Sequence, residues 1–513
     1  MGARPIRRLL IANRGEIAVR IARACRGLGI DPIAVASEAD RGAFHTRVAA
    51  ETVFVGPAAP AESYLDIDRL LRAGRERRCD AIHPGYGFLS QNPRFAEAVE
   101  GAGLIFVGPP PQAMRLMGDK IAARRAMAAA GVTVVPGYEG AGDESEEAFK
   151  NEAGRIGYPV LVKAAGGGGG RGMRVVHEPD ELGPALDGAR REALKAFGDA
   201  RLFLEKVVED ARHIEVQILA DGRGRYVHLF ERECSIQRRF QKMIEESPSP
   251  LVDVGLRAQM ADAAIAAARA CGYVNAGTVE FLVDRDGDFF FLEMNTRIQV
   301  EHGVTELLTG VDIVQAQIRI AAGEPLTLRQ QDVRQDGHAL ECRLNAEDPS
   351  RAFSPSSGRV LLASFPEGPG IRVDAGVETG DLVSPYYDSL IAKVLVHAGD
   401  RAAAIAIMQE ALARTAVLGV ETNVPYLRAI LAHPVFRAGE ATTEFTARQL
   451  GGWRPVAGPV PDEALAVAGL AEALGATIGF GAGAGANVGA ASDDDVDVYS
   501  PWARADRFRA GVR

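Results

Sequence analysis

Two glutamates on facing strands carry the strongest chemical signal in this sequence. Residues 277–302, GTVEFLVDRDGDFFFLEMNTRIQVEH, contain two apolar runs around the turn-forming DRDGD, a pattern that predicts an antiparallel hairpin. With the turn centred on residues 286–287, the register places Glu280 roughly opposite Glu293. Two carboxylates about 5 Å apart repel each other unless a cation joins them. The pair therefore predicts a metal site.

The chain beyond this hairpin keeps its polar side chains on one face. If residues 293–301 stay extended, the odd-numbered positions carry Glu, Asn, Arg, Gln and Glu, while positions 292, 294, 298 and 300 are apolar. An ordinary half-exposed strand also alternates, but it does not need an acid across a hairpin from another acid. Because Glu280, Glu293 and Asn295 offer only oxygen ligands, the pattern favours Mg2+ or Mn2+. Nucleotide phosphoryl transfer is the chemistry that follows.

A second candidate element is the glycine run KAAGGGGGRGM at residues 163–173. It matches G-x-G-x-x-G, but a dinucleotide fingerprint must open a helix, and the strand-like MRVVHE follows instead. No Gly-Lys-Ser/Thr closes the run, so a Walker loop is also excluded. Two interpretations remain open. One is a flap whose bare amides approach phosphate oxygens, with Lys163 and Arg171 at its ends; the other is a floppy surface hairpin.

Composition limits the class of protein. The 513 residues are enough for three or more domains, and the net charge of -10 disfavours a nucleic-acid binder. Five cysteines without paired spacing suggest neither a disulfide framework nor a zinc site, which fits a cytoplasmic protein. No apolar segment is long enough to span a membrane. Only seven of the 58 basic residues are lysines, so each lysine marks a position where a compact ammonium is useful, for example against phosphate.

The elements that must position these residues fall into regions. Residues 1–117 alternate short apolar runs with helical patterns, which predicts a parallel α/β sheet with crossover helices. The pattern predicts two α+β units, residues 118–335 and residues 336–447, the first with a flap subdomain at about 134–205. Residues 448–513 read as a helix, a Gly/Ala-rich linker and a tail of unclear role.

Long motifs along the chain resemble the biotin carboxylase component of biotin-dependent acyl-CoA carboxylases, in the ATP-grasp superfamily. The resemblance runs from residue 6 to about 447 through IANRGEIAVRIARAC, HPGYGFLSQNPRFAE, RLMGDK, YPVLVKAAGGGGGRGMRVV, RHIEVQILAD, ERECSIQRRFQKMIEESPSP, FLEMNTRIQVEH and HALECRLNAEDP. It implies an N-terminal Rossmann-like domain, a central ATP-grasp domain with the glycine flap, and a C-terminal α+β domain. It also implies an enzyme that makes carboxyphosphate from ATP and bicarbonate and then carboxylates biotin.

The same resemblance implies partners and a pathway. The biotin would be held on a biotin carboxyl carrier protein or domain, and a carboxyltransferase subunit would use the carboxybiotin. An acetyl-CoA or propionyl-CoA carboxylase is expected, with a place in fatty acid biosynthesis, and the component is expected to be a homodimer.

The resemblance assigns site residues position by position. The residues assigned to ATP are Lys120, Lys163, Gly168, Gly169, Gly170, Glu205, Lys206, Val207, Val208, His213 and Gln237. Two Mg2+ or Mn2+ ions would be bound by Glu280, Glu293 and Asn295. Bicarbonate would be positioned by Lys242, Arg297, Gln299 and Val300. Glu301 would take its proton, and Arg343 would stabilise the enolate-like ureido oxygen of biotin.

These roles are also chemically sensible. A glutamate beside a bound anion is a suitable base, and a guanidinium fork suits planar bicarbonate. A fixed cation suits the oxyanion of enolised biotin, and closure of a glycine flap would exclude water from carboxyphosphate. Without the resemblance, His213 would read as strand packing and Arg343 as a surface ion pair.

Two positions depart from the family pattern. Phe240 stands where relatives usually have His beside the nucleotide phosphates, and Gln91 where they have Glu. Two rival functions stay open: another ATP-grasp ligase, which need not share the bicarbonate and biotin residues, and a non-enzymatic nucleotide-binding regulator, which would be expected to have lost a metal carboxylate. ATP turnover that depends on bicarbonate separates them.

The tail carries a prediction of its own. No lysine follows Lys393, so the chain offers no biotin acceptor of the Met-Lys-Met type beyond that point. The closing VYSPWARADRFRAGVR is similar to the stretch that leads to the carrier domain in longer carboxylases. Two interpretations stay open: the stretch is the stump of a longer polypeptide, or it is a docking tail for a separate carrier. In both cases we expect the isolated chain to carry no covalent biotin, to carboxylate free biotin poorly, and to work faster with a separately made biotinylated carrier.

Overall fold

The computed structural model describes residues 4–139, 145–166, 173–455 and 462–473. The chain forms two compact units, Met1–Val456 and Ala457–Arg513. In the second unit the described element is α16 (Asp462–Ala473).

The N-terminal region is a five-stranded parallel sheet, as the alternating pattern predicted. Its strands, in spatial order, are β3 (Glu51–Gly56), β2 (Asp31–Ser37), β1 (Arg8–Ile11), β4 (Ala81–His83) and β5 (Ile105–Phe106). The accompanying helices are α1 (Gly15–Gly27), α2 (Phe44–Arg47), α3 (Ile67–Glu76), α4 (Pro93–Gly101) and α5 (Pro111–Gly118). In β1, Leu9 and Leu10 enter two different hydrophobic cores, so the sheet is covered on both faces.

A large antiparallel sheet of eight strands holds most of the site. Its order is β14 (Phe289–Asn295), β13 (Asn275–Val283), β10 (Arg212–Ala220), β11 (Tyr226–Arg238), β12 (Gln241–Ser247), β15 (His338–Asn345), β22 (Leu390–Ala398) and β20 (Ile371–Ala375). Since β12 pairs with β15, one sheet runs from the central region of the chain into the C-terminal region.

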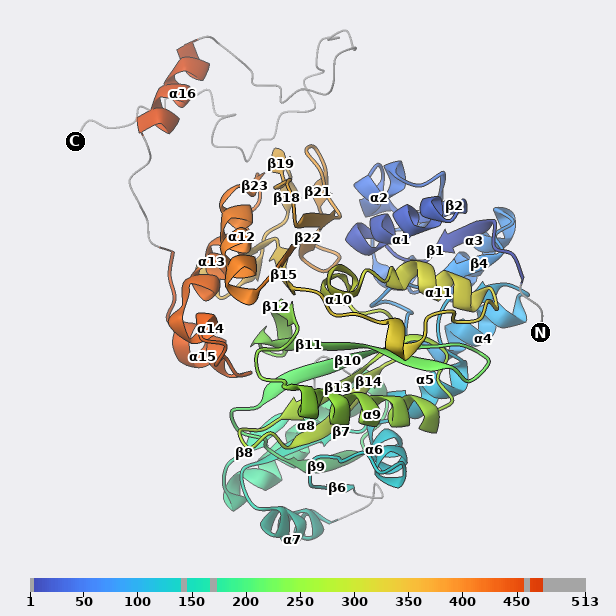
Figure 1. The fold of residues 1–513 in the computed structure, drawn as a ribbon, viewed down its shortest axis with the longest axis vertical. Coiled ribbons are helices and arrows are strands. Elements are labelled where there is room, and N and C mark those ends of the chain that lie inside the picture. Colours follow the sequence, from blue (N-terminus) through green and yellow to red (C-terminus); the bar gives the residue numbers. More distant parts are fainter. Residues whose placement is uncertain (1–3, 140–144, 167–172, 456–461, 474–513) are drawn as a thin grey trace. The chain divides into compact units, whose positions relative to one another are not determined.

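Helices cover this sheet. In sequence order they are α9 (Val254–Ala270), α10 (His302–Thr309), α11 (Ile313–Ala321), α12 (Arg401–Ala413), α13 (Val424–Ala432), α14 (Pro434–Arg437) and α15 (Phe445–Leu450). Figure 1 shows α9 along β10 and β11, and α11 beside α1, although these two helices are far apart in the sequence. Among the described helices, none has the length and apolar character needed to cross a membrane.

A smaller antiparallel sheet carries the glycine run between two of its strands. Its order is β6 (Gly137–Glu139), β9 (Leu202–Lys206), β7 (Val160–Ala164) and β8 (Arg174–Val176), flanked by α6 (Lys120–Ala129), α7 (Glu146–Ile156) and α8 (Leu182–Phe197). The pairing of β7 with β8 confirms the predicted strands on either side of the run. Gly168, Gly169 and Gly170 lie outside the described residues, as does Arg171. The choice between flap and floppy hairpin therefore stays a prediction.

Three two-stranded sheets complete the C-terminal region. They pair β16 (Glu347–Asp348) with β17 (Ser354–Pro355), β18 (Gly358–Arg359) with β21 (Leu382–Val383), and β19 (Leu362–Ser364) with β23 (Ala416–Leu418).

Candidate active site

A cavity of about 970 Å³ lies among the N-terminal sheet, the small sheet and the large sheet. Every predicted site residue within the described ranges lines it. These residues are Lys120, Lys163, Glu205, Lys206, Val207, Val208, His213, Gln237, Lys242, Glu280, Glu293, Asn295, Arg297, Gln299, Val300, Glu301 and Arg343. Residues that are far apart in the sequence are thus brought to one site.

The predicted hairpin is present. Strands β13 and β14 pair antiparallel with Glu280 opposite Glu293, which confirms the predicted register. Gly287 in the turn has φ +87°, a conformation that glycine adopts without strain. The amide nitrogen Nδ2 of Asn295 donates to Glu280 Oε1 at 2.8 Å and lies 3.4 Å from Glu293 Oε1. Two carboxylates and one amide therefore meet, a donor set that suits a hard oxygen-seeking ion.

The extended conformation expected to continue through residue 301 is wrong beyond Asn295. Strand β14 ends there, residues 296–300 form a loop, and Glu301 is the residue before α10. The ladder between β13 and β14 ends at the pair of Thr278 and Asn295. The start of α10 then packs closely on the large sheet, since a Cβ on Gly303 would come within 2.2 Å of Leu395 Cδ2. Glu301 still reaches the cavity, but it does so from a loop.

Lys242 on β12 lies at the centre of the site. Its ammonium donates to Glu215 Oε2 at 2.6 Å, to Glu280 Oε1 at 3.0 Å and to Glu301 Oε1 at 2.7 Å. Burial opposes its charge, but the surrounding acidic groups outweigh burial and hold the pKa of Lys242 well above its usual value. The lysine is therefore a fixed positive charge among carboxylates.

Arg343 on β15 joins Glu301 from the other side. Its guanidinium donates to Glu245 Oε1 at 2.6 Å and to Glu301 Oε2 at 2.9 Å. Burial disfavours the ionised form of Glu301, yet the charges of Lys242 and Arg343 hold its pKa well below the usual value. Burial raises the pKa of Glu245 to about 7, although Arg343 opposes this. Each oxygen of Glu301 is thus bound by a different cation.

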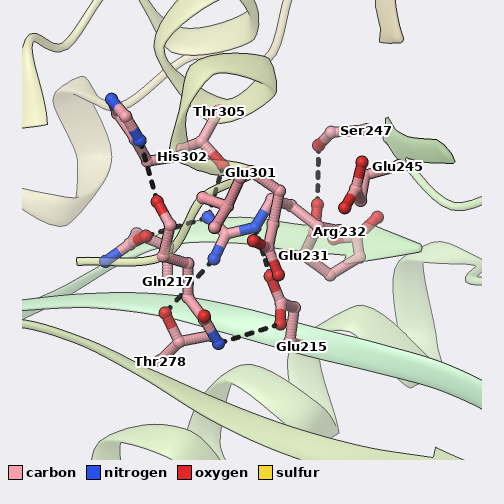
Figure 2. Close-up of polar contacts among 12 residues, drawn as sticks. Glu215, Gln217, Glu231, Arg232, Glu245, Ser247, Thr278, Glu301, His302 and Thr305 are labelled. Carbon is pink, nitrogen blue, oxygen red and sulfur yellow. Dashed lines mark hydrogen bonds and ion pairs between the residues drawn. The ribbon is translucent and has the colours of Figure 1, made fainter. Parts of the chain in front are cut away.

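The resemblance did not point to three residues that support this centre: Glu215, Arg232 and Glu245. Figure 2 shows the fully buried Arg232 among its acceptors, of which Glu215 Oε1 lies at 2.5 Å and Gln217 Oε1 at 2.8 Å. Thr278 and Thr305 also accept from it. A signal for Glu215 was present, because polar residues recur at positions 213, 215 and 217 inside the apolar strand β10.

Two groups of possible metal ligands occur here among the described residues: His213, Glu215 and Glu280, and Glu215, Cys234 and Glu301. Lys242 already pairs with all three of these glutamates. Because Glu280 also belongs to the predicted metal set, these ion pairs do not separate the two clusters from the set of Glu280, Glu293 and Asn295, to which the resemblance assigns the metal.

The small sheet supplies the other side of the cavity. Lys163 Nζ donates to Glu205 Oε2 at 2.6 Å, and Arg124 donates to Glu205 Oε1 at 2.5 Å. The ammonium of Lys206 donates to the carbonyls of residues 157 and 158 at 2.9 and 2.8 Å, so its side chain is anchored to the segment between α7 and β7. Burial lowers the pKa of Lys120, and the nearby charge of Lys163 adds to this.

The departures from the family pattern lie in different places. Phe240 lines the cavity with 59% of its surface exposed, at the turn between β11 and β12. Gln91 is exposed and does not line this cavity. A phenyl ring therefore faces the space where the resemblance places a polar side chain.

Comparison with known proteins agrees with this geometry. Residues 5–114 match the family described as the biotin carboxylase N-terminal domain, residues 119–329 match the ATP binding domain of the carbamoyl-phosphate synthase L chain, and residues 341–448 match the biotin carboxylase C-terminal domain. The chain is 52% identical over 438 residues to a biotin carboxylase of Nostoc sp., covering 85% of this chain and 98% of the relative. It is 50% identical to a pyruvate carboxylase subunit of Methanothermobacter thermautotrophicus, covering 85% and 89%.

Solved structures give the same result. A biotin carboxylase from Campylobacter jejuni in a beta-gamma-ATP complex aligns with TM-score 0.85 at 44% identity, covering 87% of this chain and 99% of that one. The biotin carboxylase domain dimer of Hydrogenobacter thermophilus 2-oxoglutarate carboxylase, with MgADP, ADP and bicarbonate, aligns with TM-score 0.83 at 45% identity, covering 87% and 98%. The chain belongs to the biotin carboxylase family of ATP-grasp ligases.

Proposed function

We propose that this chain carboxylates biotin on a carrier protein or domain, using ATP and bicarbonate, as the first half-reaction of a biotin-dependent carboxylase. The observation that carries the proposal is Glu301, whose two oxygens contact Lys242 and Arg343. A single carboxylate thereby links the residue proposed to bind bicarbonate with the residue proposed to bind biotin.

The nucleotide end would be formed by the small sheet and the hairpin. Lys120 and Lys163 would face the phosphates of ATP, because an ammonium is a compact partner for phosphate oxygens. Glu280, Glu293 and Asn295 would hold Mg2+ or Mn2+, which would neutralise the charge that develops on the transferred phosphoryl group. The flap at residues 163–173 would cover this end and exclude water.

The bicarbonate end would use the loop before α10. Bicarbonate attacks the γ-phosphorus of ATP, a new phosphorus–oxygen bond forms, and ADP leaves. Glu301 would take the proton that bicarbonate gives up. With its two oxygens held by cations, Glu301 is a weak base in this state. Binding of bicarbonate to Lys242 would loosen that hold and raise the pKa of Glu301, so that the base becomes active when the substrate is present.

The biotin end would use Arg343, which Glu245 orients at 2.6 Å. Carboxyphosphate would break into carbon dioxide and phosphate. The released phosphate would take the proton of biotin N1', and N1' would then attack the carbon dioxide. The negative charge that moves onto the ureido oxygen would be stabilised by the guanidinium. A carrier protein or domain would deliver the biotin, and a carboxyltransferase subunit would use the product.

The final acceptor is the finer part of the proposal. We infer an acyl-CoA carboxylase of the acetyl-CoA or propionyl-CoA type, with a role in fatty acid biosynthesis. Relatives at similar identity include a pyruvate and a 2-oxoglutarate carboxylase, so these acids are the alternatives to test. The solved 2-oxoglutarate relative is a dimer, which supports a homodimer here.

The test is ATP cleavage by the purified chain, measured with and without bicarbonate and with and without biotin. We expect phosphate release to require bicarbonate and to increase with biotin. Cleavage that requires an amine or another acid instead would identify a different ATP-grasp ligase. Nucleotide binding without cleavage under any of these conditions would identify a regulator.

A further inference from the structure

Lys393 is a buried cation next to the active site that the proposed reaction has not used. It lies on β22, and its register partners are Arg343 on β15 and Asp374 on β20. Its side chain has no exposed surface. Its ammonium donates to the backbone carbonyl of Val300 at 2.5 Å. The lysine thus reaches from the C-terminal strands to the residue immediately before Glu301.

Three carboxylates surround this ammonium. The nearest oxygens of Glu16, Glu341 and Asp374 lie at 3.6, 3.9 and 3.9 Å from Lys393 Nζ. Asp374 is also paired with Arg372 at 2.6 Å, whereas neither oxygen of Glu341 has a hydrogen-bond partner. Lys393 therefore compensates the charge of Asp374 together with Arg372. Burial holds the pKa of Glu341 well above its usual value, so Glu341 does not require a cation. An unpaired buried charge would be costly.

The same contacts join three parts of the fold. Glu16 belongs to α1, and its carboxylate accepts a hydrogen bond from the hydroxyl of Tyr86. Both residues line the active-site cavity. A Cβ at Gly376, close to β20, would come within 2.5 Å of the Glu16 nitrogen. The start of α1 is therefore packed directly on the C-terminal region, as the start of α10 is packed through Gly303. Such close packing leaves little freedom for the side chains around Lys393, which binds the loop through the carbonyl of Val300.

We propose that Lys393 is a positioning residue for the reaction: by binding the Val300 carbonyl it sets the orientation of the loop and holds Glu301 between Lys242 and Arg343. A peptide unit is planar and trans, so fixing the direction of the Val300 carbonyl also fixes the opposite direction of the Glu301 amide. Since Val300 and Glu301 both line the cavity, the bicarbonate end of the site depends on this bond. The inference rests on the proposed function of this end of the site.

The test substitutes the lysine and measures the two substrates separately. Lys393→Met removes the ammonium and leaves the chain length similar. We expect KM for bicarbonate to rise about tenfold, because roughly 1.4 kcal/mol corresponds to a factor of ten and a hydrogen bond to a charged group is of that size. KM for ATP should stay within about twofold, since the small sheet and the hairpin supply the nucleotide contacts. Lys150→Met is the matched control, because Lys150 is an exposed lysine on α7 paired with Glu146.

A double variant separates positioning from folding. Lys393→Met with Asp374→Asn removes one negative charge together with the positive one, so it should fold even if the single variant does not. If Lys393 positions the loop, the double variant keeps the raised KM for bicarbonate because Val300 has still lost its donor. Recovery of the wild-type KM in the double variant would show that Lys393 acts only through charge balance and would overturn the inference. Wild-type chain without bicarbonate-dependent cleavage would instead overturn the proposed function.

Discussion

Replacing Glu301 by Gln should remove the proposed base while leaving the fold intact. The ion pairs of 3.0 Å or less at the centre of the site connect seven lysine, arginine and glutamate side chains. Three are cations, Lys242, Arg232 and Arg343, and four are carboxylates, Glu215, Glu245, Glu280 and Glu301. Glu301→Gln balances this count at three against three. It weakens two charge-assisted hydrogen bonds, each contributing about 1.5–3 kcal/mol, but it also removes the cost of burying a carboxylate, several kcal/mol.

These opposing effects are similar in size, so we expect the free energy of unfolding to change by no more than about 2 kcal/mol. The loss of a general base should lower bicarbonate-dependent ATP cleavage by roughly 10²–10⁴-fold. Lys242→Met is the contrast, because it leaves four carboxylates against two cations. Removing one partner of a buried pair destabilises by about 3–5 kcal/mol.

The assay is phosphate release at pH 8, above the usual titration range of histidine, with thermal unfolding of the same samples. Glu301→Gln should show a Tm close to that of the wild type and very low turnover, whereas Lys242→Met should show a clearly lower Tm. Turnover of Glu301→Gln within about threefold of the wild type would refute its role as base. A Tm far below that of the wild type in Glu301→Gln, together with an unchanged Tm in Lys242→Met, would refute the explanation of stability by the balance of buried charges.

Glu280→Gln and Glu293→Gln should each abolish ATP turnover at saturating Mg2+, because each removes a charge from the proposed metal site; near-normal turnover in both would exclude that site. Arg343→Ala should keep part of the bicarbonate-dependent ATP cleavage and lose carboxybiotin formation, while Glu301→Ala loses both; equal losses in the two variants would reverse these assignments. Burial holds the pKa of Glu341 well above its usual value, so the folded protein retains a proton that the unfolded chain releases, and this residue's contribution to stability falls as pH rises above about 4.5. Glu341→Gln should therefore raise Tm more at pH 8 than at pH 5, and an equal change at both pH values would contradict the pKa. The purified chain should carry no covalent biotin, and streptavidin binding to it would contradict this.

The hairpin was predictable because its register depends on local information. The turn residues and two short apolar runs together place Glu280 opposite Glu293. The continuation past Asn295 was not, since alternating polar residues occur both in a strand and in this loop. The close packing of Gly303 on Leu395, which follows this loop, joins residues far apart in the chain and is contained in no local pattern.

Other parts of the site depend on strand order. Glu245 lies opposite Glu341 in the strand register because β12 is hydrogen-bonded to β15. These two strands are far apart in the sequence. Nothing in the spacing around Lys393 indicates that it meets the carbonyl of Val300. The long motifs could nevertheless point to the cavity-lining residues, since the members of a family share one fold and therefore bring the same positions together.

The most direct test of the proposed activity follows the carbon of labelled bicarbonate. The chain is incubated with ATP, Mg2+, labelled bicarbonate and a separately prepared biotinylated carrier. We expect label to appear on the biotin of the carrier, to require ATP, and to be lost with Glu301→Gln and with Arg343→Ala. Consumption of ATP without label on any biotinylated carrier tested, or label transferred directly to a different acceptor, would contradict the assignment as a biotin carboxylase.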